Sequence, residues 1–172
     1  MQKGCLDDSS YHVNMIINLL MRFPEIFTVT YNLGASSYCL SYMIKGKVVQ
    51  EDYISLRRRL EENLEAYCYF KKKDNCKIRL GKEHYGCFTR LEVKLAGGNL
   101  TGEEISLITR LIHDAFGPNL ISELRPDDVD LEDGVSTWEE MMSLISNRDS
   151  GSEVNKLFAF REAGKVYVYD DQ

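Results

Sequence analysis

The sequence predicts an α+β fold, in which an antiparallel sheet carries helices packed mainly on one face. Segments in which apolar residues alternate with a period of two occur in pairs, and a segment with apolar residues three or four apart follows each pair. A chain of 172 residues, 44% hydrophobic and 28% charged, is also long enough to bury a core without metals or disulfides. The expected order is α-ββα-ββα, followed by a short helix and a C-terminal hairpin.

The N-terminal third predicts one helix and two strands. The helix is expected over residues 11–22, because serines precede its apolar face as candidate caps and Pro24 ends it. Residues 26–31 and 36–44 form the two strands, joined by a turn at residues 32–34. Alternation gives the second strand two different faces. One face carries Tyr38, Leu40, Tyr42 and Ile44, and the other carries Cys39, Ser41 and Met43.

The central part predicts a long helix between two groups of short strands. A tight turn at Gly46 leads into a short run over residues 47–49. A helix follows over residues 52–70, with apolar residues at helical spacing that place it against the sheet. Residues 77–80 form a short strand, and residues 84–96 form one longer strand. The residues that alternate on one face of that longer strand are Tyr85, Cys87, Thr89, Leu91, Val93 and Leu95.

The strongest local signal is the start of the next helix. Thr101 is followed at the third position by Glu104, which is the pattern of a capping box, and an apolar stripe begins at Ile105. Gly117 and Pro118 end this helix.

Composition changes after this helix and suggests three regions. Residues 1–125 form the main α+β domain, and residues 126–152 form an acidic linker with a short amphipathic helix. Residues 153–172 form a hairpin that completes the sheet or provides a dimer interface, because an isolated hairpin is only marginally stable. Residues 1–100 carry a net charge of +4 (15 basic, 11 acidic), and residues 101–172 carry −10 (6 basic, 16 acidic). We expect the acidic part to pack on the basic part of the same or a neighbouring chain.

The N-terminal residues lack the apolar core of a signal peptide, and the apolar stretch over residues 15–21 is too short to span a membrane. We therefore expect a cytoplasmic protein without a membrane partner. Five cysteines are an odd number with no secretory context, so reduced thiols are expected.

Four residues of zinc-binding type, Cys68, Cys76, His84 and Cys87, fall within twenty positions. They lack a Cys-x-x-Cys pair, and His84 and Cys87 lie three apart on an expected strand, so their side chains point to opposite faces. A structural role is favoured, and no metal or cofactor is expected. Whether the four residues converge is left open by the sequence.

Other chemical motifs fail on spacing or charge. The acidic residues 128–134 match no register of an EF-hand, and residues 97–102 lack the lysine of a P-loop. The basic runs at 57–59 and 71–73 are better explained as a salt-bridged helix face than as a nucleic-acid site. The histidines are scattered, and no nucleophile signature is present.

These observations favour a non-enzymatic regulatory or protein-interaction domain that forms a homodimer or binds another protein. Aromatic residues and methionine are enriched in interface cores, and the short acidic helix carries Trp138, Met141, Met142 and Ile145 as a candidate interaction surface. The same helix can instead pack on its own domain. The alternative function is a small-molecule sensor or enzyme with a pocket between the sheet and the helices. Its candidate lining residues are Tyr31, Tyr38, Tyr42 and Tyr85.

Overall fold

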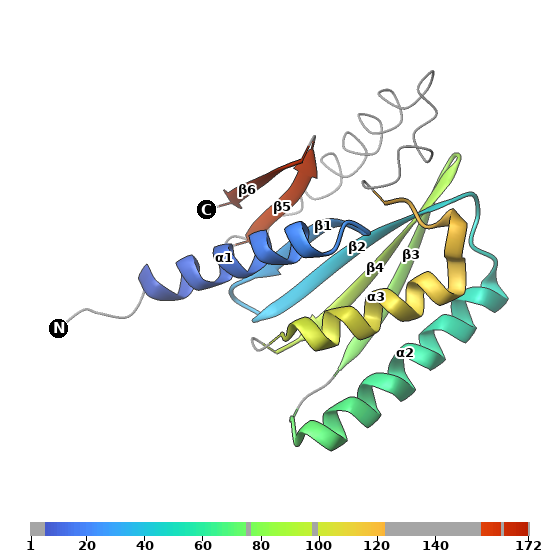
Figure 1. The fold of residues 1–172 in the computed structure, drawn as a ribbon, viewed down its shortest axis with the longest axis horizontal. Coiled ribbons are helices and arrows are strands. Elements are labelled where there is room, and N and C mark those ends of the chain that lie inside the picture. Colours follow the sequence, from blue (N-terminus) through green and yellow to red (C-terminus); the bar gives the residue numbers. More distant parts are fainter. Residues whose placement is uncertain (1–5, 75–76, 98–99, 123–155, 163, 172) are drawn as a thin grey trace.

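The computed structural model describes residues 6–74, 77–97, 100–122, 156–162 and 164–171 of the chain. Its helices are α1 (Leu6–Arg22), α2 (Gln50–Lys71) and α3 (Gly102–Phe116), with a 3-10 turn at Gly117–Asn119. Its strands are β1 (Ile26–Asn32), β2 (Ser37–Lys45), β3 (Ile78–Tyr85), β4 (Phe88–Ala96), β5 (Lys156–Glu162) and β6 (Lys165–Asp171). The six strands form one antiparallel sheet in the order β3-β4-β2-β1-β5-β6 (Figure 1). The predicted α+β class is confirmed.

The three helices pack against a common apolar face of the sheet, which we call the helix face. One cluster of buried side chains joins Leu20 of α1, Leu60 of α2 and Ile108 of α3 to residues from β1, β2, β4 and β5. Helix α1 contacts β1, β5 and β6, whereas α2 contacts β3 and packs beside α3 (Figure 1). Alternation in β2 is as predicted, since Tyr38, Leu40, Tyr42 and Ile44 all belong to this cluster.

The β3–β4 hairpin corrects the prediction of one strand over residues 84–96. The turn lies at Gly86 and Cys87, so β3 continues through Gly81 and ends at Tyr85. Gly86 has φ +50°, a conformation that glycine adopts without a Cβ clash. Because the chain reverses there, Tyr85 pairs with Phe88 and lies on the opposite face from Thr89 and the apolar residues that follow it.

Residues 47–49 also differ from the prediction, because they form no strand. Helix α2 begins directly after them at Gln50 rather than at Asp52, and its N-cap position, Val49, makes no capping side-chain bond. The segment is instead held by a side chain, since the Val48 backbone N–H donates to the Thr89 hydroxyl at 3.2 Å. At α3 the expected capping box between Thr101 and Glu104 is present in both directions.

The C-terminal hairpin is part of the main sheet, because β5 pairs along β1 from Thr28↔Phe160 to Asn32↔Lys156. Its one buried cation, Arg161, faces the helix side and joins the hairpin to the end of α1. The guanidinium donates to the backbone carbonyls of Leu20, Pro24 and Ile26. Burial lowers the pKa of Arg161 from its ordinary value, and the nearby Glu25 carboxylate opposes that change. None of the described helices is long and apolar enough to cross a membrane.

Candidate functional site

Three of the four tyrosines that were predicted to line a pocket between the sheet and the helices are packed in the core of the helix face instead. Tyr38 and Tyr42 are fully buried there, and Tyr31 is nearly so. The Tyr38 hydroxyl lies 2.7 Å from Nδ1 of His12, and the Tyr42 hydroxyl lies 2.9 Å from the Thr109 hydroxyl. These bonds satisfy polar groups inside an apolar core, as buried hydroxyls require. Burial raises the pKa of both Tyr38 and Tyr42 above the ordinary tyrosine value.

Tyr85 is separated from the other three tyrosines by the sheet itself. Together with Phe27, Met43 and Phe88 it forms a small apolar cluster on the other side, which we call the open face. A β-bulge between Ile26 and Thr28 interrupts the alternation of β1, so that Phe27 and Thr28 both face the open side while Ile26 remains in the main core. The structure therefore brings together Tyr31, Tyr38 and Tyr42 but not Tyr85.

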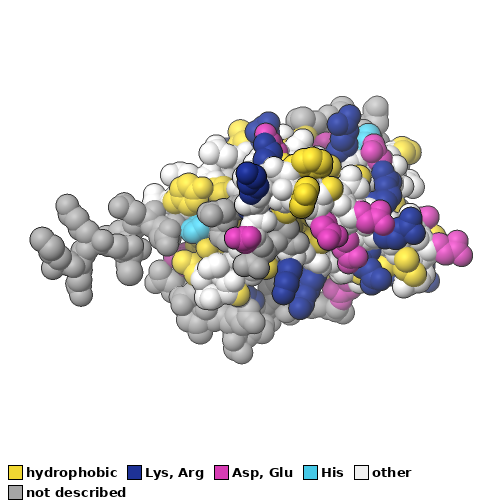
Figure 2. Space-filling model, turned by 90° about the horizontal axis from the view of Figure 1, so that it is seen from below, with side chains coloured by type: hydrophobic (Ala, Val, Ile, Leu, Met, Phe, Trp, Pro, Cys, Tyr) yellow, Lys and Arg dark blue, Asp and Glu magenta, His cyan; other side chains and the backbone are white. Residues whose placement is uncertain are grey.

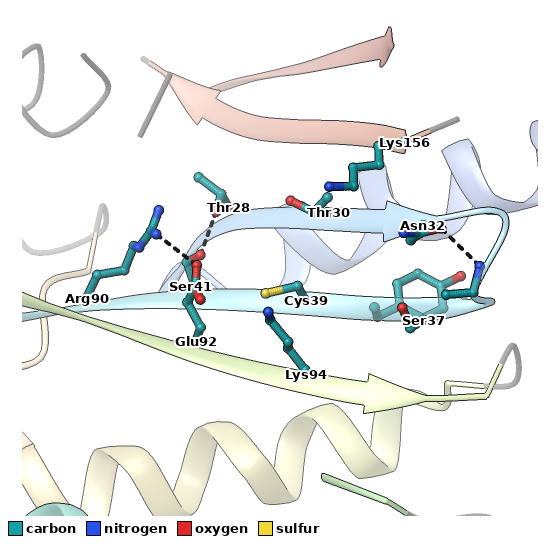
Figure 3. A pocket seen from close by; sticks show the side chains of 12 residues that line it. Thr28, Thr30, Asn32, Ser37, Cys39, Ser41, Arg90, Glu92, Lys94 and Lys156 are labelled. Atoms are coloured by element: carbon teal, nitrogen blue, oxygen red, sulfur yellow. Dashed lines mark hydrogen bonds and ion pairs between the residues drawn. The ribbon is translucent and has the colours of Figure 1, made fainter. Parts of the chain in front are cut away.

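Beside this cluster, the open face carries a shallow polar depression of about 310 Å³, which we call the trough (Figure 3). Its floor consists of short side chains on β1 and β2, and longer charged side chains on β4 and β5 flank it. The residues that line it are Thr28, Thr30, Asn32, Ala35, Ser37, Tyr38, Cys39, Ser41, Arg90, Glu92, Lys94 and Lys156. The depression thus follows from side-chain size across four neighbouring strands.

A buried arginine stands at one end of the trough. Arg90 is only 5% exposed, and its Nη2 lies 2.9 Å from a carboxylate oxygen of Glu92 and 3.3 Å from one of Glu83. The guanidinium also lies over the Tyr85 ring at 5.8 Å from its centre. Its buried Nε has no hydrogen-bond partner among the described residues. Arg90 therefore neutralises the carboxylate of Glu92 within the trough wall.

An aromatic strip continues the open face toward the end of the sheet. The Phe160 ring stacks on Tyr167 at 5.3 Å and on Tyr169 at 5.8 Å between ring centres, and it lies 6.0 Å from Phe158. Tyr167 and Tyr169 remain 38% and 54% exposed, although they stand on the last strand of the described sheet. An exposed aromatic strip beside a sheet edge is a common feature of binding surfaces.

The proposed short helix with Trp138, Met141, Met142 and Ile145 lies outside the described residues. The same holds for the acidic linker predicted at 126–152, so the structure gives no geometry for either segment.

The residues of zinc-binding type are not assembled among the described positions, where no group of three or more candidate metal ligands occurs. His84 is exposed on β3 and lies 3.2 Å from the Thr89 hydroxyl, and Cys87 is exposed in the turn. Cys76 lies outside the described residues. Cys68 is disulfide-bonded, which corrects the expectation that every thiol is reduced. Sequence spacing could not reveal this pairing, because a disulfide depends on proximity in the fold.

The basic runs at 57–59 and 71–73 contain residues that pair with acidic side chains, and the two pairs within α2 have the predicted spacing of four residues. Arg57 and Arg58 pair with the glutamates four positions later, and Arg59 pairs with Asp114 of α3. Lys71 lies 3.1 Å from Glu103, a contact that raises the pKa of Lys71 and lowers that of Glu103. Figure 2 shows the molecule from below the view of Figure 1, and on this surface basic and acidic side chains are interspersed.

Comparison of the chain with protein-family models, with curated proteins and with solved structures gives no match.

Proposed function

We propose that the chain is a non-enzymatic protein-interaction domain that forms a homodimer, with strand β6 as the interface. The observation that carries the proposal is the edge of the sheet formed by β6, which is regular, flanked by exposed aromatic rings and complementary to a second copy of itself. From the sequence, residues 153–172 were expected to complete the sheet or to provide a dimer interface, and β6 is the strand of that hairpin that ends the described sheet.

The two edges of the sheet differ in how they are protected. Strand β3 carries charges on both faces, including Arg79 and Glu83, and Lys82 points to the helix face, where its ammonium lies over the Tyr53 ring. Inward-pointing charges of this kind discourage edge-to-edge pairing. Strand β6 has no proline, and its register with β5 is continuous from Lys165 to Asp171 without a bulge. Its central residues are only valine and tyrosine.

The hydrogen-bond pattern of β6 leaves a suitable row of groups on its outer edge. Glu162 and Lys165 close a hairpin with a two-residue connection, and in such hairpins the closing pair exchanges hydrogen bonds. Alternation then directs the backbone groups of Tyr167 and Tyr169 toward β5, and those of Val166 and Val168 away from it. A further antiparallel strand can therefore pair with the outer edge through these valines.

A second β6 fits this edge in one fully overlapping register. A two-fold axis at Val168 pairs it with Val168 of the second copy and keeps the open faces of both sheets on the same side. Tyr167 of each copy then stands opposite Tyr169 of the other, which gives two cross-strand aromatic pairs. Lys165 is brought opposite the acidic C-terminal end of the other strand. The resulting sheet has twelve strands, which is the sum of two described sheets of six.

A charge-swap experiment tests this register directly. The Tyr167→Lys/Tyr169→Lys variant places lysine opposite lysine twice, and the corresponding double glutamate variant places glutamate opposite glutamate twice. Loss of two aromatic pairs and gain of two repulsive pairs amount to about 2–4 kcal/mol, so each variant is expected to dimerise about 30- to 1000-fold more weakly. An equimolar mixture of the two variants should restore the dimer, because lysine then faces glutamate. Sedimentation velocity over a concentration series measures dimer formation by the lysine variant, the glutamate variant and their mixture.

The matched control changes the exposed aromatic pair of α2, Tyr69 and Phe70, to the same charged residues. Each of these rings is 81% exposed and lies away from β6. The control variants are expected to dimerise like the unmodified chain. A monomeric unmodified chain at every concentration, or a dimer that the lysine variant leaves unchanged while it stays folded by circular dichroism, contradicts the proposal.

A further inference from the structure

We infer that the trough on the open face binds a small oxyanion, such as the carboxylate or phosphate group of a metabolite. This inference is independent of the β6 interface, because the trough is lined by β1, β2, β4, β5 and the β1–β2 turn, without any residue of β6. The predicted small-molecule pocket was placed between the sheet and the helices, whereas the trough lies on the opposite face.

The trough owes its shape to side-chain length. At the open-face positions of β1 and β2, Thr28, Thr30, Ser37, Cys39 and Ser41 are all short. Most of their sheet neighbours on β4 and β5 are longer, since Cys39 pairs with Lys94 and Thr30 pairs with Phe158, whereas Ser37 pairs with Ala96. A volume of about 310 Å³ is at the lower end of the range for small-molecule sites.

The floor of the trough carries hydroxyl groups that can donate hydrogen bonds. Thr28 and Ser41 are buried at 2% and 4% exposure, and the Thr28 hydroxyl donates to Ser41 Oγ at 2.8 Å. This bond leaves the Ser41 proton to be donated to another acceptor. The hydroxyls of Thr30 and Ser37 lie farther along the same floor. A row of hydroxyls is suited to the oxygens of a carboxylate or phosphate.

Two lysine side chains flank the floor of the trough. Lys94 extends from β4 toward Cys39, and Lys156 extends from β5 over Thr30, so the two side chains approach the floor from opposite sides (Figure 3). Three strand spacings separate β4 from β5, which is roughly 14 Å, and two extended lysines can enclose one oxyanion within that span.

The charge balance of the wall favours an anion as well. Within the described part of the chain, Glu92 is the only acidic residue that lines the trough, and its carboxylate is already paired with Arg90. Lys94 has no ion-pair partner among the described residues. Among the described residues that line the trough, three are basic and one is acidic. Arg90 is held by both Glu92 and Glu83, so the lysines supply the attraction for a negatively charged group.

Cys39 makes occupancy of the trough measurable. Its thiol lies on the floor outside any disulfide, and Cys87, which is exposed in the β3–β4 turn away from the trough, provides an internal reference. The two cysteines fall on different tryptic peptides. The rate of alkylation at each can therefore be followed in the intact chain by peptide mass spectrometry, with inorganic phosphate or succinate as the probe and chloride at equal ionic strength as the reference.

Under the inference, phosphate or succinate slows alkylation of Cys39 by a factor of 1 + [L]/Kd, about tenfold at ten times Kd, and leaves Cys87 unchanged. Protection by phosphate alone identifies a phosphoryl ligand, and protection by succinate alone identifies a carboxylate. The Lys94→Gln/Lys156→Gln variant should lose protection, and Lys47→Gln, at an exposed lysine outside the trough, should keep it. Equal effects of chloride, no protection by either probe, or protection that survives in the double glutamine variant overturns the inference.

Discussion

Arg161 offers the sharpest test of how the C-terminal hairpin is fixed to the rest of the fold. Its side chain is 6% exposed and donates to three backbone carbonyls at the end of α1 and the start of β1. Substitution by methionine keeps most of the apolar stem but leaves those carbonyls without their charged donor. Each hydrogen bond to a charged group contributes about 1.5–3 kcal/mol to stability. The variant also no longer has to bury a guanidinium, and this gain offsets part of the energy lost with the hydrogen bonds.

We therefore expect Arg161→Met to lower the free energy of unfolding by about 3 kcal/mol. With a urea m-value of about 2 kcal/mol/M, the midpoint falls by roughly 1.5 M. The melting temperature falls by about 6–12 °C for a chain of this size. Urea unfolding followed by circular dichroism measures the change at one fixed protein concentration.

Two further variants separate the role of the guanidinium from that of charge alone. Arg161→Lys keeps the charge but loses the planar fork, so it should recover only part of the loss. Arg110→Met removes an exposed arginine of α3 and should change stability by less than about 0.5 kcal/mol. If Arg161→Met costs under about 1 kcal/mol, the buried guanidinium is not what holds the hairpin to α1.

Two other predictions concern α3 and the buried tyrosines. Thr101→Ala removes the acceptor of the Glu104 N–H, which lies 3.3 Å from the threonine hydroxyl, and should cost about 1 kcal/mol in urea unfolding; Ser106→Ala, at an exposed position of the same helix, is the control. Because burial raises the folded-state pKa of Tyr38 and Tyr42 above 10.0, their stabilisation is complete below about pH 10 and is lost as the pH rises further. Ultraviolet titration should accordingly show at least two of the ten tyrosines ionising only as the chain unfolds, and a single transition for all ten would contradict this.

The sequence alone determined those parts of the fold whose signals are local. The capping box at Thr101 and Glu104 predicted the start of α3, because both partners lie within one helical turn. Alternation in β2 correctly separated the core residues from Cys39, Ser41 and Met43, because successive strand residues point to opposite faces. The salt-bridged face of α2 followed from residues four positions apart.

Tertiary structure decided the features that depend on turns and on distant pairing. A reversal at Gly86 placed Tyr85 on the open face, although a single alternating strand had put it with Thr89 and Leu91. Strand β5 joined β1 across more than a hundred residues of chain, a pairing that no local pattern specifies. That pairing buried Arg161, whose charge gave the sequence no indication of a core position.

The trough depends on the same distant pairing. Its floor comes from β1 and β2, but its walls come from β4 and β5, so the hollow exists only once the strand order is fixed. The self-complementary order of residues in β6 can be read in the sequence, whereas its place at the edge of the sheet cannot. Local periodicity reports which way a side chain points, and only the folded sheet determines which side chains become its neighbours.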